Sequence, residues 1–226
     1  MVYLLAFILA FCSIAYELLL GQSLSAFLGN TVLRYSVTIG LYMFSMGMGS
    51  LMAEGKFMKH PIITLLKVEV LLTVMGGFSV IFLLALDFVG MPPLLFSLFA
   101  HVLIMLIGIL TGFEIPLLMQ LKHLETEHAE SLVLGVNYLG AFFGTIIFAF
   151  VLYPLVGLIP TAFFVALLNA TVGIALLTQS HKVQLQEYKQ YRRLIGVQSM
   201  LFIIFLPCLL FANSVNELFL KYYLKS

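Results

Sequence analysis

Three glutamates lie inside long apolar stretches of this chain: Glu17 in IAYELLLG, Glu69 in LKVEVLL and Glu114 in LTGFEIPLL. A charged side chain at the centre of a membrane helix costs about 2.5–3.5 kcal/mol on insertion scales. Such acids are therefore neutralised, paired or used. We expect these three to bind a ligand or to accept protons.

Helical geometry gives each of these acids an approximate depth. Glu69, Glu114 and Asn137 fall at a similar depth on three successive apolar segments, which predicts one shared site, with Tyr138 beside Asn137 as a further hydrogen-bonding group. Glu17 lies deeper and could meet Arg34. Two structural alternatives stay open, a local pair of Glu69 with Lys67 and a hydrogen bond from Glu114 to a neighbouring helix.

The segment around Glu114 also contains Pro116, which has no N–H to donate to the carbonyl of Gly112. A free backbone carbonyl is tolerated inside a membrane only where neighbours or water satisfy it. An acid, a free carbonyl and two glycines within one turn predict a pocket for a cation or a proton.

The composition identifies the elements that must position these groups. The chain has 226 residues, of which 62% are hydrophobic and 9% are charged, whereas soluble domains carry about 25% charged residues. A membrane helix needs about 20 residues, and the apolar runs are continuous. We therefore predict an all-α polytopic membrane protein, a single transmembrane domain over 1–226. The expected spans are 2–21, 34–53, 62–86, 93–119, 131–153, 155–178 and 194–212, with a segment at the membrane surface over 181–193.

Small residues recur at helical spacing within these spans, and such residues let membrane helices approach closely. The glycines expected at helix contacts are Gly40, Gly47, Gly49, Gly108, Gly112, Gly140 and Gly144, with Pro116 expected to kink its helix.

Other chemistry is disfavoured. Cys12 and Cys208 lie in apolar spans and indicate packing, with no disulfide or nucleophile. The cluster from His123 to Glu130 is typical of a hydrated turn, so we expect no metal and no cofactor. The basic residues lie in loops and form no dense patch, which gives no sign of nucleic acid as a partner.

Lysine and arginine are unevenly divided between the loops. Lys56, Lys59, Lys122, Lys182, Lys189, Arg192 and Arg193 fall on one side, against Arg34, Lys221 and Lys225 on the other. Because basic loops stay in the cytoplasm, we expect a cytoplasmic amino terminus, an exterior carboxyl terminus and residence in the plasma (inner) membrane of a prokaryote.

An ordered series of motifs carries a family resemblance. The motifs are YELLLG (16–21), SAFLGNTV (25–32), IGLYMFSMGMGS (39–50), VEVLLTVMGGFS (68–79), GILTGFEIPLLMQ (108–120), VNYLGAFFGTIIFAFVLYPLVGL (136–158) and LLNATVGI (167–174). Together they resemble the transmembrane domain of membrane-bound spermidine synthases, the polyamine aminopropyltransferases. Asn30 and Asn137 stand where that family often has an acid. The chain shows no glycine-rich turn after a strand to hold an S-adenosyl group.

The buried acids and the resemblance together leave three possible functions. The protein could bind or transport polyamines, or anchor a separately encoded aminopropyltransferase. It could instead be a proton-coupled transporter of another small solute, or the membrane half of a split aminopropyltransferase. By itself the chain is not expected to be an enzyme.

Overall fold

The computed structural model describes residues 1–123 and 130–223, and this part of the chain is helical, without strands. The long helices are α1 (Val2–Leu28), α2 (Thr31–Met52), α4 (Pro61–Gly77), α5 (Ser79–Phe88), α6 (Pro93–His123), α7 (Glu130–Ile147), α8 (Leu158–Ala175) and α9 (Tyr188–Tyr223). The short helix α3 (Lys56–Lys59), the π-helical turns η1 (Phe148–Val156) and the 3₁₀ turns η2 (Leu176–Lys182) and η3 (Leu185–Glu187) connect them.

Six stretches of the described chain are helical, long and apolar enough to cross a membrane. They are Val2–Leu28, Pro61–Phe88, Pro93–His123, Glu130–Val156, Leu158–Ser180 and Leu185–Ala212. The protein is thus a polytopic helical membrane protein, as its composition predicted. The remaining expected span, 34–53, corresponds to α2, which has 22 residues but is less apolar than the other six.

Several boundaries differ from the expected ones. α1 continues to Leu28, where Gly29 and Asn30 turn the chain with φ of 66° and 50°. The expected surface segment 181–193 is not one separate element, because its residues 188–193 form the start of the long helix α9. Glycine accounts for the turn between η1 and α8, since Gly157 has a φ of 91°.

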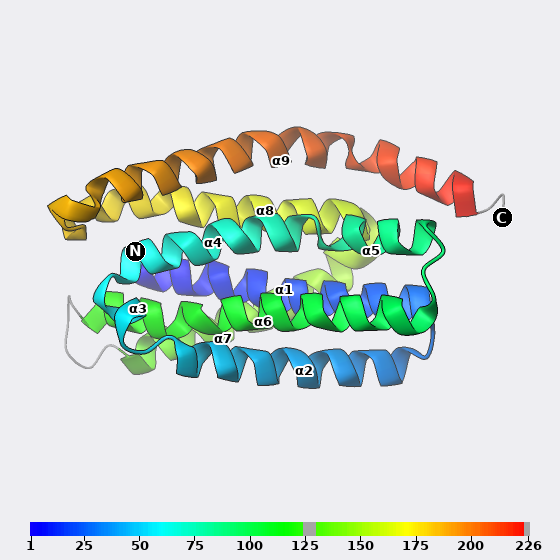
Figure 1. Ribbon diagram of the computed structural model, residues 1–226, viewed down its shortest axis with the longest axis horizontal. Coiled ribbons are helices and arrows are strands. Elements are labelled where there is room, and N and C mark those ends of the chain that lie inside the picture. The colour runs from blue at the N-terminus through cyan, green and yellow to red at the C-terminus, as the bar shows by residue number, and fades with distance from the viewer. Residues whose placement is uncertain (124–129, 224–226) are drawn as a thin grey trace.

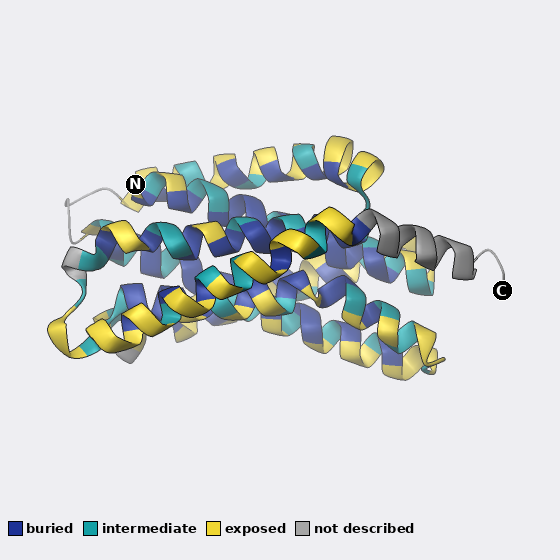
Figure 2. Cartoon of the chain, turned by 90° about the horizontal axis from the view of Figure 1, so that it is seen from above, coloured by how far each residue is buried: buried dark blue, intermediate teal, exposed yellow. Residues whose placement is uncertain are grey.

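α1 forms the centre of the bundle (Figure 1), in contact with α2, α6, α7 and α8. In the most apolar 18-residue stretch of α1, 72% of the residues are buried. In the corresponding stretch of Leu185–Ala212, which belongs largely to the outer helix α9, 17% are buried. Figure 2 shows this difference, with exposed residues along much of α9. Glu17, which lies on α1, is therefore held in the best-packed helix of the bundle.

Close contact between α2 and α6 depends on glycine. A Cβ on Gly49 would lie 2.0 Å from the Ile109 carbonyl oxygen, and one on Gly112 would lie 2.2 Å from that of Met46. Gly108 similarly faces Ser45. Any side chain at these positions would force the two helices apart.

α1 and α7 meet in the same way. A Cβ on Gly140 would lie 2.2 Å from the Phe7 carbonyl oxygen, and one on Gly144 would lie 2.4 Å from the side chain of Ile14. Gly40 and Gly47 do not share this role, because both are exposed on α2 and nothing approaches within 4 Å of a Cβ there. Helical spacing alone had grouped them with the packing glycines. Pro116 lies inside α6 without ending it.

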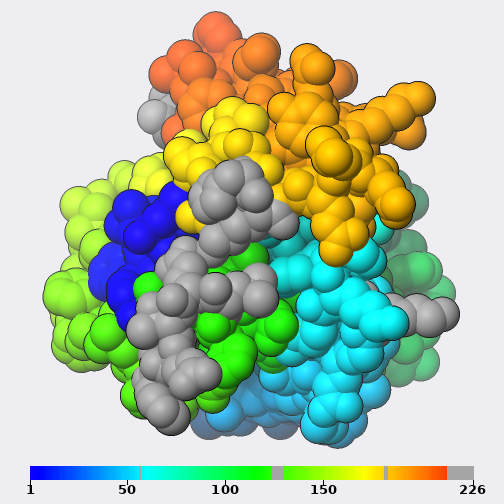
Figure 3. Space-filling model, turned by 90° about the vertical axis from the view of Figure 1, so that its left-hand side faces the viewer, coloured from blue at the N-terminus to red at the C-terminus, as the bar shows by residue number. Residues whose placement is uncertain are grey.

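The chain returns to its own start after α8. The Thr178 hydroxyl and the Gln179 side-chain amide both reach the sulfur of Met1. Figure 3 views this end of the bundle, where the start of α4 in cyan adjoins the segment before α9 in orange. We call it the basic end, because Lys59, Lys122, Lys189, Arg192 and Arg193 lie on the segments that meet there.

Candidate functional site: an acidic groove

A groove of about 390 Å³ lies between α1, α2, α6 and α7. We call it the acidic groove. Its polar lining comes from Ser13, Glu17, Thr111, Glu114, Asn137 and Tyr138. Its apolar lining comes from Ala10, Ile14, Met43, Met46, Ile115, Leu134 and Ala141. Four of the five residues expected to bind a ligand or a proton therefore border one hollow.

Glu17 and Glu114 lie in the buried part of this groove. Glu17 is 7% exposed and Glu114 is 3% exposed, whereas Met43 and Tyr138 on the flanking helices are 63% and 66% exposed. The groove is therefore open along α2 and α7 and acidic along α1 and α6. Glu17 lies one turn after Ser13, so helical spacing puts both on the groove face of α1.

Glu69 is placed differently from its expected position. It is fully buried on α4 and does not line the acidic groove. α4 packs against α6, and the charges of the Glu69 and Glu114 carboxyl groups interact. Counting along the helices predicted a shared level for these acids, but it could not show that the face of α4 bearing Glu69 points at the bundle centre.

No basic side chain neutralises these acids within the described residues. Neither oxygen of Glu69 has a hydrogen-bond partner, and Oε1 of Glu114 also has none. Lys67 is exposed, away from Glu69, so the local pair does not form. Arg34 does not pair with Glu17 either, and its Nε makes no hydrogen bond.

Weakly polar groups surround Glu69 and Glu114. Cys12 and Tyr16 of α1 lie close enough to Glu69 and Glu114 to feel their charges. Tyr16 donates to the carbonyl of Leu72 at 3.5 Å, and Tyr42 donates to that of Ser13 at 3.0 Å. These hydroxyl groups are therefore engaged with the backbone and leave the carboxyl oxygens unpaired.

This arrangement can hold an organic cation. Two buried carboxyl groups attract positive charge strongly, because their surroundings screen it less than water does. The methionines and aliphatic side chains of the same groove suit the methylene groups of an alkylamine. Among the described residues, no three His, Cys, Asp or Glu side chains come together in a group that could hold a metal ion. Most of the cluster from His123 to Glu130 lies outside them.

Sequence reasoning did not single out Ser13, Thr111, Met43 or Met46 as parts of this site. A usable signal existed for the first two. Ser13 precedes Glu17 by four residues and Thr111 precedes Glu114 by three, the spacings that share a helix face. Nothing in the sequence indicated which face of α2 would meet α6.

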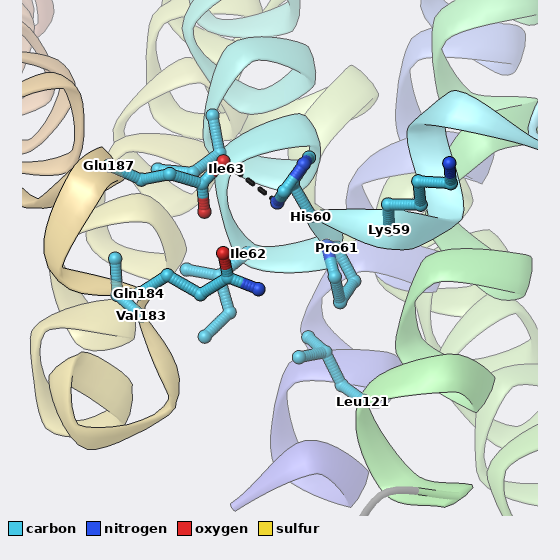
Figure 4. Close-up of a pocket in the computed structure, with 9 residues that line it drawn as sticks. All are labelled: Lys59, His60, Pro61, Ile62, Ile63, Leu121, Val183, Gln184 and Glu187. Carbon is cyan, nitrogen blue, oxygen red and sulfur yellow. Dashed lines mark ion pairs between the residues drawn. The ribbon is translucent and has the colours of Figure 1, made fainter.

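A second hollow of about 190 Å³ lies at the basic end (Figure 4). His60, at the start of α4, points toward Glu187 of η3, and Nδ1 lies 2.8 Å from Oε1. Lys59 and Gln184 also line this hollow. The ion pair links the α3–α4 connection to the segment before α9.

Most of this chain matches one region of known enzymes. It is 38% identical over 177 residues to a polyamine aminopropyltransferase of Leptospira interrogans, covering 77% of this chain and 34% of that protein. The chain is 34% identical over 174 residues to polyamine aminopropyltransferase 2 of Ralstonia nicotianae, and this match covers 76% of this chain and 34% of that protein. The chain is 37% identical over 179 residues to polyamine aminopropyltransferase 1 of Streptomyces coelicolor, and this match covers 76% of this chain and 32% of that protein.

The chain is related to the polyamine aminopropyltransferases. The resemblance expected from its ordered motifs is thereby confirmed. The chain spans about a third of the length of these relatives. No family model matches it, and no solved structure does.

Proposed function

We propose that this protein binds polyamines in the acidic groove, within the inner membrane of a prokaryote. The observation that carries the proposal is the joint lining of one hollow by Glu17 and Glu114, both buried, together with methionine and aliphatic side chains. A polyamine alternates ammonium groups with methylene chains. Its charges would meet the carboxyl groups, and its methylenes would contact Met43, Met46 and Ile14.

The relationship to polyamine aminopropyltransferases supports the ligand class, since those relatives are named for polyamines. Asn137 and Tyr138 would contribute hydrogen bonds from α7 to an ammonium group. Replacing a buried charged partner of a bound cation costs about 2–5 kcal/mol. The acids of the groove should therefore dominate the affinity.

The test is calorimetric titration of the purified protein in nanodiscs with putrescine and spermidine. We expect Glu114→Gln to weaken binding at least about 30-fold, while the thermal unfolding temperature stays close to that of the wild type. Glu54→Gln is the matched control, because Glu54 is exposed outside the groove. A neutral diol of the same length as putrescine should not bind.

Unchanged affinity in Glu114→Gln and in Glu17→Gln would overturn the groove as the binding site. Binding of the diol as tightly as putrescine would overturn the role of charge. Flux of labelled putrescine into proteoliposomes then distinguishes transport from binding alone.

A second candidate function is the anchoring of a separately encoded aminopropyltransferase. Its support is that relatives more than twice as long share only this region, about a third of their length, with the chain. The exposed residues Leu185, Lys189 and Arg193 at the basic end would be the docking surface. Co-purification of a soluble synthase with the wild type, lost in Leu185→Asp, would support it.

A further inference from the structure

The buried carboxyl pair behind the groove has no partner that accounts for it. Glu69 is 0% exposed, and neither of its oxygens has a hydrogen-bond donor. α4 packs against α6, and the charge of Glu69 acts on Glu114, whose Oε1 is unpartnered too. An isolated ionised carboxylate in such a place is far too costly to persist, and two adjacent ones cost more.

The groups that face the pair come from each neighbouring element. α1 contributes Cys12 and Tyr16, and also Glu17, which lines the groove together with Glu114. α2 contributes Tyr42 toward Glu114, and α6 contributes Glu114 itself. The polar side chains of α8 and α9 near α4, Asn169 and Gln198, are neutral amides. No described side chain supplies a compensating positive charge. With the groove empty, the positive charge must come from bound protons.

We infer that Glu69 and Glu114 form a proton-exchange site, at which an ammonium group entering the acidic groove displaces one proton from the pair. The exchange balances in charge and atoms. The pair loses one proton to the aqueous phase, and one ammonium charge takes its place beside Glu114. No bond other than the carboxyl O–H breaks, and no oxidant or reductant takes part.

The two residues have different roles in this exchange. Glu114 lines the groove and contacts the amine. Glu69 does not line it, so it acts as a positioning residue: because two interacting carboxyl groups cannot both ionise, it keeps a proton on the pair until the amine arrives. Replacing Glu69 should therefore change the proton count and leave the amine contacts in place.

This inference rests on the proposed amine binding, and the experiment separates the two. The affinity for putrescine is measured by titration in nanodiscs at several values between about pH 6 and 8.5. A primary alkylammonium group keeps its charge over this range, since the lysine ammonium has a pKa of about 10.4. One-for-one exchange predicts about a tenfold gain in affinity for each pH unit while the pair is protonated.

Titrations in buffers of different ionisation enthalpy count the released protons directly. We expect about one proton per putrescine for the wild type and for Glu54→Gln. For Glu69→Gln we expect retained binding, less than half the proton release and a flatter pH dependence. A bis-quaternary diammonium ligand, which carries no exchangeable proton, should release the same number from the wild type.

Infrared difference spectra provide a measurement that needs no variant. Addition of amine to the wild type should remove the C=O stretching band of a protonated carboxyl group. Putrescine binding with no proton release and no loss of this band would overturn the inference and leave the binding function intact. Full proton release in a folded Glu69→Gln protein would overturn the role of Glu69. Absence of binding at every pH would overturn both.

Discussion

The side chain of Gln198 on α9 donates from Nε2 to Thr73 Oγ1 on α4, at 3.1 Å, and to the backbone carbonyl of Asn169 on α8, at 3.2 Å. One fully buried amide thereby connects the outermost long helix to two helices of the inner bundle. Gly173 makes room for it, because a Cβ there would lie 2.5 Å from Gln198 Cγ. α9 is therefore docked specifically, although most of its surface is exposed.

Removing this hydrogen bond should loosen α9. We expect Gln198→Ala and Thr73→Val each to lower the thermal stability in detergent. The double variant should lose less than the sum of the single losses, because the two changes remove the same hydrogen bond. Coupling energies of such bonds in membrane proteins average about 0.6 kcal/mol. Strict additivity in the double-mutant cycle would show that the contact contributes nothing.

The α2–α6 contact should be intolerant of a single methyl group. Gly49→Ala places a Cβ within 2.0 Å of a backbone oxygen, which cannot move without shifting α6. We expect a loss of about 1–3 kcal/mol, the usual cost of overpacking, seen as a lower unfolding temperature. Gly47→Ala, two residues earlier on the same helix, meets open space. It should leave stability unchanged or slightly raised, and equal losses in both variants would contradict the packing described here.

An added carboxyl group in the groove should strengthen amine binding. Asn137 lines the groove beside Tyr138. Asn137→Asp places a third acid beside the ligand, and we expect affinity for putrescine to rise about tenfold, equal to about 1.4 kcal/mol. Asn30→Asp is the control, since Asn30 caps α2 outside the groove. Identical affinities for wild type and Asn137→Asp would place the amine elsewhere.

Opposite ends of the bundle should differ in their accessibility from outside the cell. In a background with Cys12 and Cys208 replaced, Leu185→Cys marks the basic end and Val89→Cys the far end, at sites 95% and 77% exposed. Because basic loops stay in the cytoplasm, a membrane-impermeant maleimide added to intact cells should label Val89→Cys alone. Labelling of Leu185→Cys in intact cells would reverse the orientation. Both should react in permeabilised cells.

The sequence was a good guide to the helices, because hydrophobic length determines a membrane span almost by itself. It was a weaker guide to which face of each helix points toward its neighbours. Glu17 was expected to lie apart from Glu114 and instead shares the groove with it, since both α1 and α6 turn these residues toward the same gap. Glu69 was expected in the shared site and lies behind it.

The glycines show the same limit. Gly47 and Gly49 are two residues apart on one helix, yet Gly49 touches the backbone of α6 and Gly47 faces outward. Composition and spacing do not distinguish them, because the rotation of a helix about its axis depends on contacts with helices distant in the sequence. The Gln198–Thr73 contact joins residues 125 positions apart and was beyond any local pattern for the same reason.

The return of the chain from α8 to Met1 has a topological consequence. Before α9, the polypeptide has traversed the bundle an even number of times if α2 is included, and it re-emerges beside its own amino terminus. α9 then makes one additional traverse along the outside. The two ends of α9 consequently lie at opposite ends of the bundle, so this one peripheral helix carries the chain away from its amino terminus again.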